Sequence, residues 1–102
     1  MINLVKAVFG RAGNSSKLDE VLAQGAVIVD VRSAGEFASG HAKGAVNIPL
    51  DQLEAKMSKI KGYRQPIVVC CASGMRSARA KAFLAGQGIA DLHDAGSWRN
   101  LN

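Results

Sequence analysis

Two short runs rich in β-branched residues constrain the fold of this chain more than any other feature. One covers residues 26–31 (Ala-Val-Ile-Val-Asp-Val) and the other residues 66–70 (Pro-Ile-Val-Val-Cys). Neither run alternates apolar with polar residues, as a strand with one solvated face would. Both are therefore expected to be strands buried on both faces, which is typical of parallel sheets covered by helices.

Segments with helical patterns lie on either side of these two strands. The first has apolar residues on one face, a serine able to cap its start and a glycine able to end it. Two others begin with capping-box spacing, and a helix of small residues follows the second strand. The first expected helix covers residues 16–24, with Ser16 as its cap, Leu18, Val21 and Leu22 facing inward and Gly25 at its end. The second covers residues 34–39 and is capped by Ser33 and Glu36, and the third has its capping residues at Asp51 and Glu54 and an apolar stripe of Leu53, Met57 and Ile60. The fourth covers residues 76–87, with Ala80, Phe83 and Leu84 facing inward and Gly88 at its end.

The remaining segments complete an alternation of strands and helices. Residues 45–48 predict a short strand stopped by Pro49, residues 89–93 a final strand, and residues 96–100 a closing turn or short helix. This order predicts an α/β domain with a central, mostly parallel sheet of four to five strands and helices on both faces. A chain of 102 residues fits one domain, expected at 16–102, after an N-terminal strand or mobile segment at 1–15.

Composition narrows the functions open to the chain. Lysines and arginines outnumber acidic residues by 13 to 8, giving a net charge of +5, but the basic residues are spread along the chain. The few aromatic residues do not alternate with basic ones, so we expect no nucleic-acid partner. A basic surface would instead attract small anions. The apolar run at residues 1–10 is too short and interrupted for a signal peptide or a membrane span, so no membrane partner is expected.

The two cysteines, Cys70 and Cys71, are adjacent. Neighbouring side chains on a strand point to opposite faces, which does not suit a shared metal ion. The chain also lacks the spaced cysteines of a disulfide framework. We therefore expect free thiols, no metal or other cofactor, and a monomeric protein in the reducing cytoplasm.

Cys71 is the strongest candidate for a reactive side chain. It follows the second buried strand, at the carboxyl end where open α/β sheets bind ligands. The small residues after it allow the backbone N–H groups of the loop to turn inward as an anion nest. The next helix adds the positive end of its dipole, and Arg76 adds a full charge. Together these features should lower the pKa of the thiol below about 8.5 and populate a nucleophilic thiolate.

A cysteine at a strand end is often only a small buried apolar residue. Cys70, which lies within the strand, fits that description, and we interpret it as a packing residue. Position, loop composition and the following helix distinguish Cys71 from it. A disulfide between the two neighbours would be strained.

Four segments, taken in order, match the pattern of one family. They are Asp30-Val-Arg32 followed by Glu36-Phe37; Gly-His-Ala-Lys-Gly-Ala-Val-Asn-Ile-Pro at 40–49; Cys71-x-x-Gly74-x-Arg76-Ser77; and Ala-Gly-Ser-Trp at 95–98. Over roughly residues 16–100 the chain resembles a rhodanese domain, which implies a rhodanese-like α/β fold. The last segment departs from the family's Gly-Gly-x-x-x-Trp ending, because it is one residue shorter and has Ala in place of the first Gly.

The resemblance implies that Cys71 becomes a persulfide and that the backbone of the following loop cradles the outer sulfur. The substrate-binding residues it implies are Ala72, Ser73, Gly74, Met75 and Arg76, and the supporting residues are Asp30, Arg32 and Ser77.

The supporting residues are expected to act through structure rather than chemistry. Asp30 should tie down neighbouring loops, and Arg32 should pair with an acid such as Glu36. His41 lies in a turn and is expected to hydrogen-bond backbone rather than to act as a base. His93 has no partner evident in the sequence and is expected at the surface.

The reaction implied by the resemblance moves a sulfane sulfur in two steps. A small anionic donor such as thiosulfate, or a persulfide, gives its outer sulfur to Cys71, and cyanide, a thiol or a protein cysteine then takes it. Because only Arg76 supplies charge in the loop, a preference for thiosulfate does not follow.

Two alternatives stay open. One is a non-enzymatic binding or sulfur-relay module. The other is a cysteine phosphatase or arsenate reductase. The related phosphatases and arsenate reductases place five residues between Cys and Arg, whereas this chain has four. No aspartate lies in or next to the loop to serve as the general acid that a phosphatase needs.

Overall fold

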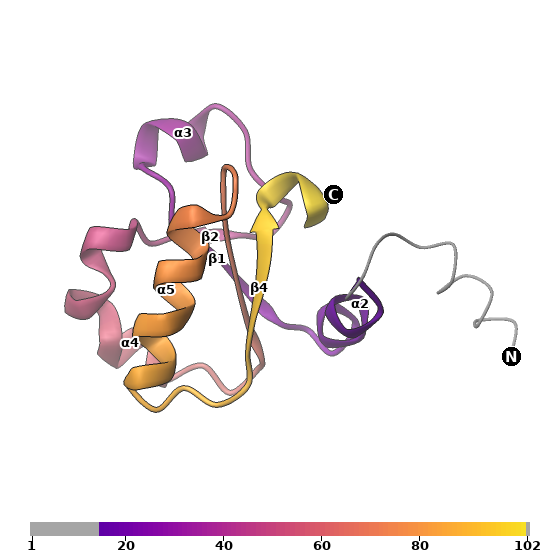
Figure 1. The fold of residues 1–102 in the computed structure, drawn as a ribbon, viewed down its shortest axis with the longest axis vertical. Coiled ribbons are helices and arrows are strands. Elements are labelled where there is room, and N and C mark those ends of the chain that lie inside the picture. Colours follow the sequence, from indigo (N-terminus) through magenta and orange to yellow (C-terminus); the bar gives the residue numbers. More distant parts are fainter. Residues whose placement is uncertain (1–14, 102) are drawn as a thin grey trace, which may run out of the picture.

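A computed structural model describes residues 15–101 of the chain (Figure 1). The described strands form one sheet in the order β2-β1-β3-β4, and all of its pairings are parallel. The strands are β1 (Val27–Asp30), β2 (Val46–Asn47), β3 (Ile67–Cys71) and β4 (Leu92–Ser97). The predicted α/β class and parallel sheet are thus confirmed, with four strands in the described part of the chain.

Helices cover both faces of this sheet. Figure 1 shows α5 and α4 on one side and α2 on the other. The longest described helix, α5, has 12 residues, and no helix within residues 15–101 is long and apolar enough to cross a membrane. The helical elements are α2 (Ser15–Ala23), α3 (Ala34–Ala38), α4 (Met57–Lys61), α5 (Met75–Gly86) and the 3-10 turns η1 (Leu50–Gln52), η2 (Glu54–Lys56) and η3 (Trp98–Leu101).

The central strand β3 divides the core into two clusters, because its side chains alternate between the faces. Ile67, Val69 and Cys71 join the cluster that includes Leu53, Ile60, Ala80 and Leu84. Val68 and Cys70 join the cluster on the other face, with Val21 and Ala95 and with Leu18, Leu22 and Trp98 packed against it. All five residues of β3 are buried, as its unbroken apolar run predicts.

Three helix starts differ from the sequence-based expectation, that of α5 by one residue, because it begins at Met75 rather than at residue 76. α2 already includes Ser15, so Ser16 lies inside the helix rather than ahead of it. The segment after β2 begins at Leu50, whose N–H donates to the carbonyl oxygen of Val31, and no side chain caps it. The cap position is Pro49, two residues before the expected cap Asp51, and two 3-10 turns precede α4. The predicted N-terminal segment 1–15 falls outside the described residues except for Ser15.

The last strand lies further along the chain than the predicted residues 89–93. Gly88 takes a left-handed conformation (φ 93°) after α5, and the N–H of Ile89 bonds back to the carbonyl oxygen of Leu84. Residues 88–91 therefore complete the helix end and a connection. Pairing with β3 begins where Leu92 lies opposite Ile67.

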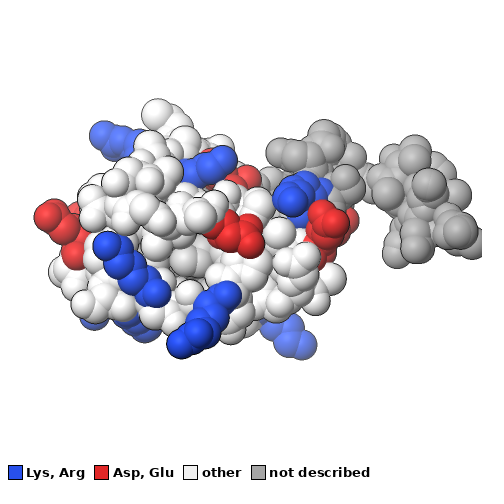
Figure 2. All heavy atoms as spheres, turned by 90° about the horizontal axis from the view of Figure 1, so that it is seen from below, with Lys and Arg blue, Asp and Glu red and all other residues white. Residues whose placement is uncertain are grey.

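Basic side chains are spread over the end of the molecule at which the strands begin. Figure 2 shows lysines and arginines on this end separated by acidic and uncharged residues. This face therefore offers no continuous basic stripe, the feature by which a nucleic-acid-binding surface would be recognised.

Candidate active site

Cys71 is the last residue of β3, at the carboxyl end of the sheet. Its side chain is almost wholly buried, with 1% exposed. The sulfur accepts two backbone hydrogen bonds, from the N–H of Gly74 at 2.9 Å and from the N–H of Ser77 at 3.3 Å. The expected inward turn of the loop is therefore present, with N–H groups directed at the sulfur.

Glycine makes this turn possible at position 74. Gly74 has φ 110° and immediately precedes α5, a conformation that L side chains rarely adopt. A Cβ at this position would meet its nearest neighbour, the Cα of Gly96, at an ordinary 3.8 Å. Backbone conformation, rather than lack of space, is what requires glycine here.

The other predicted loop residues differ in exposure. Ala72 is half-buried, whereas Ser73 and Met75 are exposed, Met75 by 75%. Ser77 is fully buried in the first turn of α5, and its hydroxyl lies 3.2 Å from the carbonyl oxygen of Gly74, to which it can donate.

Opposing influences act on the ionisation of Cys71. Burial raises the pKa of the thiol and is the largest single influence. Hydrogen bonds from the hydroxyl and N–H of Ser77, and from the N–H groups of Gly74 and Ser73, together outweigh it, so the pKa lies below its ordinary value. The Ser77 hydroxyl has one proton and two acceptors, the sulfur and the Gly74 carbonyl, so it can favour the thiolate only when turned toward the sulfur.

The neighbouring cysteine, Cys70, differs from Cys71 in the direction of its pKa shift. Cys70 is fully buried on the opposite face of the sheet. Burial, followed by the negative charge of Asp30, raises the pKa of this thiol to about 12. It remains protonated and packs as a small apolar residue, in agreement with the sequence-based interpretation.

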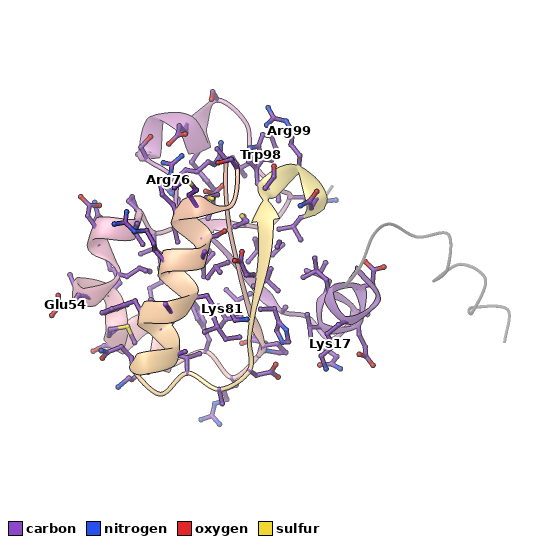
Figure 3. All side chains as sticks on the ribbon, viewed as in Figure 1. Lys17, Glu54, Arg76, Lys81, Trp98 and Arg99 are labelled. Atoms are coloured by element: carbon purple, nitrogen blue, oxygen red, sulfur yellow. The ribbon has the colours of Figure 1, made fainter. Side chains whose placement is uncertain are left out.

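Arg76 carries the expected full charge, but an acidic side chain from another element compensates it. Its guanidinium donates to both carboxylate oxygens of Glu36, at 2.7 Å from Nη1 and 3.0 Å from Nη2. The cause is the position of α3, which brings Glu36 to the start of α5 from forty residues earlier in the chain. Figure 3 shows Arg76 at the end of α5 nearest α3.

Arg32 does pair with an acid, as expected, but the acid is Asp30 rather than Glu36. Arg32 pairs with Asp30 at 2.7 Å, and both side chains are buried. The guanidinium also donates to the carbonyl oxygens of Gly40, at 2.7 Å, and Glu36, at 3.3 Å. Asp30 therefore positions Arg32, and Arg32 holds the turn that contains Gly40, which is the loop-tying role expected of Asp30.

Trp98 was not predicted as part of this region. The guanidinium groups of Arg32 and Arg99 both lie over its ring, 4.8 and 4.7 Å from the ring centroid. The ring also closes over Gly40, where a Cβ would come within 3.3 Å of it. Figure 3 places Trp98 and Arg76 at the same end of the sheet.

The histidines have no contact with the sulfur. His41 is exposed; its Nδ1 lies 2.8 Å from the carbonyl oxygen of Phe37, as the turn predicted. His93 lies in a strand, as predicted, but it is only 18% exposed rather than fully at the surface, and it has a partner that the sequence did not reveal, Asp91 at 2.7 Å. Among the described residues, no group of three His, Cys, Asp or Glu side chains is arranged to hold a metal ion.

Two surface hollows lie away from Cys71. One, of about 370 Å³, is lined by residues of α4, the start of β3 and the segment after α5. The other, of about 330 Å³, lies between α2, α5 and β4. Neither of these two hollows is lined by residues of the loop 71–76, and the candidate site is defined by the hydrogen-bonded cysteine.

Comparison with known proteins identifies the family. The profile of the Rhodanese-like domain matches residues 14–99 of this chain. The chain belongs to the rhodanese-like domain family.

Individual relatives agree with this assignment. YqhL, an uncharacterized protein of Bacillus subtilis, is 36% identical over 69 residues, which cover 68% of this chain and 54% of YqhL. The thiosulfate sulfurtransferase GlpE of Pseudomonas savastanoi pv. phaseolicola is 39% identical over 70 residues, which cover 69% of this chain and 65% of GlpE. The solved structure of the human single-domain sulfurtransferase TSTD1 superposes with a TM-score of 0.67 at 30% identity, over 83% of this chain and 88% of that one. The chain thus spans less than two thirds of the length of these two curated relatives.

Proposed function

We propose that this protein is a sulfurtransferase that carries a sulfane sulfur as a persulfide on Cys71. The observation that carries the proposal is the buried Cys71 sulfur, which accepts hydrogen bonds from the N–H groups of Gly74 and Ser77. These donors stabilise negative charge on the sulfur, both in the attacking thiolate and in the persulfide that replaces it.

The proposed cycle has two displacements. In the first, the Cys71 thiolate attacks the outer sulfur of a donor such as thiosulfate or a persulfide. The S–S bond of the donor breaks, and its electron pair leaves with sulfite or with a thiolate. In the second, cyanide, a thiol or a protein cysteine attacks the outer sulfur of the persulfide and regenerates the Cys71 thiolate. The cycle needs no metal, organic cofactor or external oxidant.

Intact-mass spectrometry after brief incubation with thiosulfate, or with glutathione persulfide, tests this proposal. The wild type should gain one sulfur atom, and Cys71→Ser should gain none. Cys70→Ser, which removes the neighbouring thiol, should still gain sulfur and is the matched control. Full sulfur transfer by Cys71→Ser would overturn the mechanism. No gain by the wild type with either donor would favour a binding module without enzymatic activity.

Phosphate-ester hydrolysis is the less favoured chemistry. The loop has four residues between Cys71 and Arg76, and the guanidinium is bound to Glu36. A phosphatase would need that guanidinium free to bind the phosphoryl oxygens. We expect no Cys71-dependent release of p-nitrophenol from p-nitrophenyl phosphate under conditions in which the persulfide forms.

A further inference from the structure

The charge of the active-site loop is compensated from outside the loop. Arg76 is the only charged residue in the segment 71–76. Its guanidinium and the carboxylate of Glu36 meet through two parallel hydrogen bonds of 2.7 and 3.0 Å. Such a fork has a fixed geometry and is stronger than a single contact.

Glu36 is itself held in place by α3. Its Oε1 accepts hydrogen bonds from the N–H and the hydroxyl of Ser33, both at 3.0 Å, as part of a capping box. The hydrogen bonds from Arg76, and then from Ser33, lower the pKa of Glu36 to about 2. The carboxylate is therefore charged at any pH at which the protein would work, and the pair as a whole is neutral.

Arg76 immediately precedes Ser77 in the first turn of α5, and the N–H of Ser77 lies 3.3 Å from the Cys71 sulfur, so the charge of Arg76 lies beside the site. Glu36 is the main reason that the pKa of Arg76 is raised, and the Cys71 thiolate contributes to the same shift. Without Glu36, a donor at the sulfur would meet an uncompensated guanidinium. With Glu36 in place, the groups that contact the sulfur are the N–H groups of Gly74 and Ser77, which carry no net charge.

We infer that Glu36 determines donor specificity: by compensating Arg76, it favours sulfane-sulfur donors with at most one negative charge over the thiosulfate dianion. This inference rests on the proposed sulfurtransferase function. Alkyl persulfides and thiosulfonates belong to the favoured class. Glu36 does not touch the reacting atoms and acts through Arg76, so it is a specificity-determining, positioning residue.

Two donors that differ by one charge isolate this effect. Thiosulfate is a dianion and methanethiosulfonate is a monoanion, and both carry a terminal sulfur bonded to a sulfonyl-type sulfur. Attack by Cys71 breaks that S–S bond in each, and the electron pair leaves with sulfite or with methanesulfinate. Both reactions leave the same persulfide on Cys71, so cyanide can serve as a common acceptor.

The variant that tests the inference is Glu36→Gln. A glutamine at this position can still accept the capping-box hydrogen bonds, so α3 should keep its start. The ratio of kcat/KM for thiosulfate to kcat/KM for methanethiosulfonate should rise by about three- to tenfold, mainly through a lower KM for thiosulfate, and the rise should shrink with added salt. Arg76→Gln should lower the ratio below that of the wild type, because Glu36 then repels the dianion.

Glu54→Gln is the matched control. Glu54 is exposed on η2, which Figure 3 shows beside α5 and away from the end of that helix that carries Arg76, and its substitution changes the net charge by the same amount. It should leave the ratio unchanged. A ratio that stays constant in Glu36→Gln, or that rises equally in Glu54→Gln, would overturn the inference even if the persulfide forms normally. If neither donor adds sulfur to wild-type Cys71, the proposed function fails as well.

Discussion

Two arginine–carboxylate pairs flank the site and differ mainly in their exposure to solvent. Asp30 and Arg32 are 0% and 5% exposed, whereas Glu36 and Arg76 are 38% and 36% exposed. The first pair joins residues two positions apart at the end of β1. The second joins α3 to the start of α5 across forty residues of sequence.

This difference in solvent exposure implies a different role for each ion pair. A buried pair must be satisfied by many hydrogen bonds, and removing one partner leaves an uncompensated charge away from water. A half-exposed pair is screened by solvent and contributes little to stability, so its charge balance can serve the chemistry of the site. We therefore expect the Asp30–Arg32 pair to matter for folding and the Glu36–Arg76 pair to matter for substrate selection.

The largest effect on stability is expected from Asp30→Ala. The change leaves the Arg32 guanidinium buried without its counter-charge and should lower the free energy of unfolding by about 3–5 kcal/mol. Urea denaturation would measure the loss, with Asp51→Ala, at an exposed position, as the control. An unchanged unfolding curve combined with lost sulfur transfer would mean that Asp30 serves the chemistry rather than the folding of the domain.

Lengthening the loop should impair sulfur transfer much more than stability, the reverse of the effect expected for Asp30→Ala. One glycine inserted between Ser73 and Gly74 moves the N–H donors away from the Cys71 sulfur without touching Asp30 or Arg32. Because small misplacements at a reacting centre are costly, kcat/KM should fall by about 100-fold. The melting temperature should move much less than in Asp30→Ala. Stopped-flow or steady-state assays would measure the fall, and normal kinetics would mean that loop size does not select the reaction.

Ser77→Ala tests whether the hydroxyl of Ser77 lowers the pKa of Cys71. Removing the hydroxyl takes away one of the donors that lower the pKa of Cys71, so the pKa should rise. The thiolate fraction falls as pH drops through the pKa, so the alkylation profile should move to higher pH. The alkylation rate of the variant near pH 6.5 should fall by up to about tenfold relative to the parent protein, and the alkylation rates of the two proteins should converge at high pH.

Iodoacetamide alkylation in a Cys70→Ala background would follow this reaction at a single thiol. Ser73→Ala is the control, because it keeps its backbone N–H. Equal profiles for Ser77→Ala and the parent would mean that the hydroxyl remains on the Gly74 carbonyl and does not act on the sulfur.

The smallest effect on stability is expected from Glu36→Gln. The pair it weakens is more than a third exposed, so the loss in unfolding free energy should be far below that of Asp30→Ala. A carboxylate with a lowered pKa contributes stability above its unfolded pKa, and this contribution disappears as pH falls through about 2. The small difference from the wild type should therefore be the same at pH 5.5 and pH 8 in thermal melts. A loss as large as that of Asp30→Ala would remove the distinction between the pairs.

The sequence predicted those parts of the molecule that depend on local patterns. The runs at 26–31 and 66–70 predicted β1 and β3, since runs of β-branched residues are typical of strands in a sheet covered on both faces. All of β3 is buried as expected, whereas Val27 and Ile28 of β1 are only half-buried. The capping box at Ser33 and Glu36 predicted the start of α3. The nucleophile was predicted because its strand end, small-residue loop and following helix are contiguous in the chain.

The errors arose where the partner of a side chain comes from another element. Glu36 was offered as an acidic partner of Arg32, whereas the fold brings Arg76 to that carboxylate and pairs Arg32 with Asp30. Trp98 was seen only as part of an ending motif, since nothing local predicts its contact with Arg32. The displacement of β4 arose because Gly88 and Ile89 finish α5, so pairing begins only at Leu92.

The division of the two cysteines between opposite faces of β3 also bears on oxidative damage. Adjacent Cα atoms are about 3.8 Å apart, closer than the usual range for a disulfide, and these two sulfurs lie on opposite sides of the sheet. With only two cysteines in the chain, a sulfenic acid formed at Cys71 has no resolving thiol of its own. Recovery must come from a thiol in solution. Under peroxide, survival of activity should therefore depend on the external thiol supply, and without it Cys71 would proceed to the irreversibly oxidised acids.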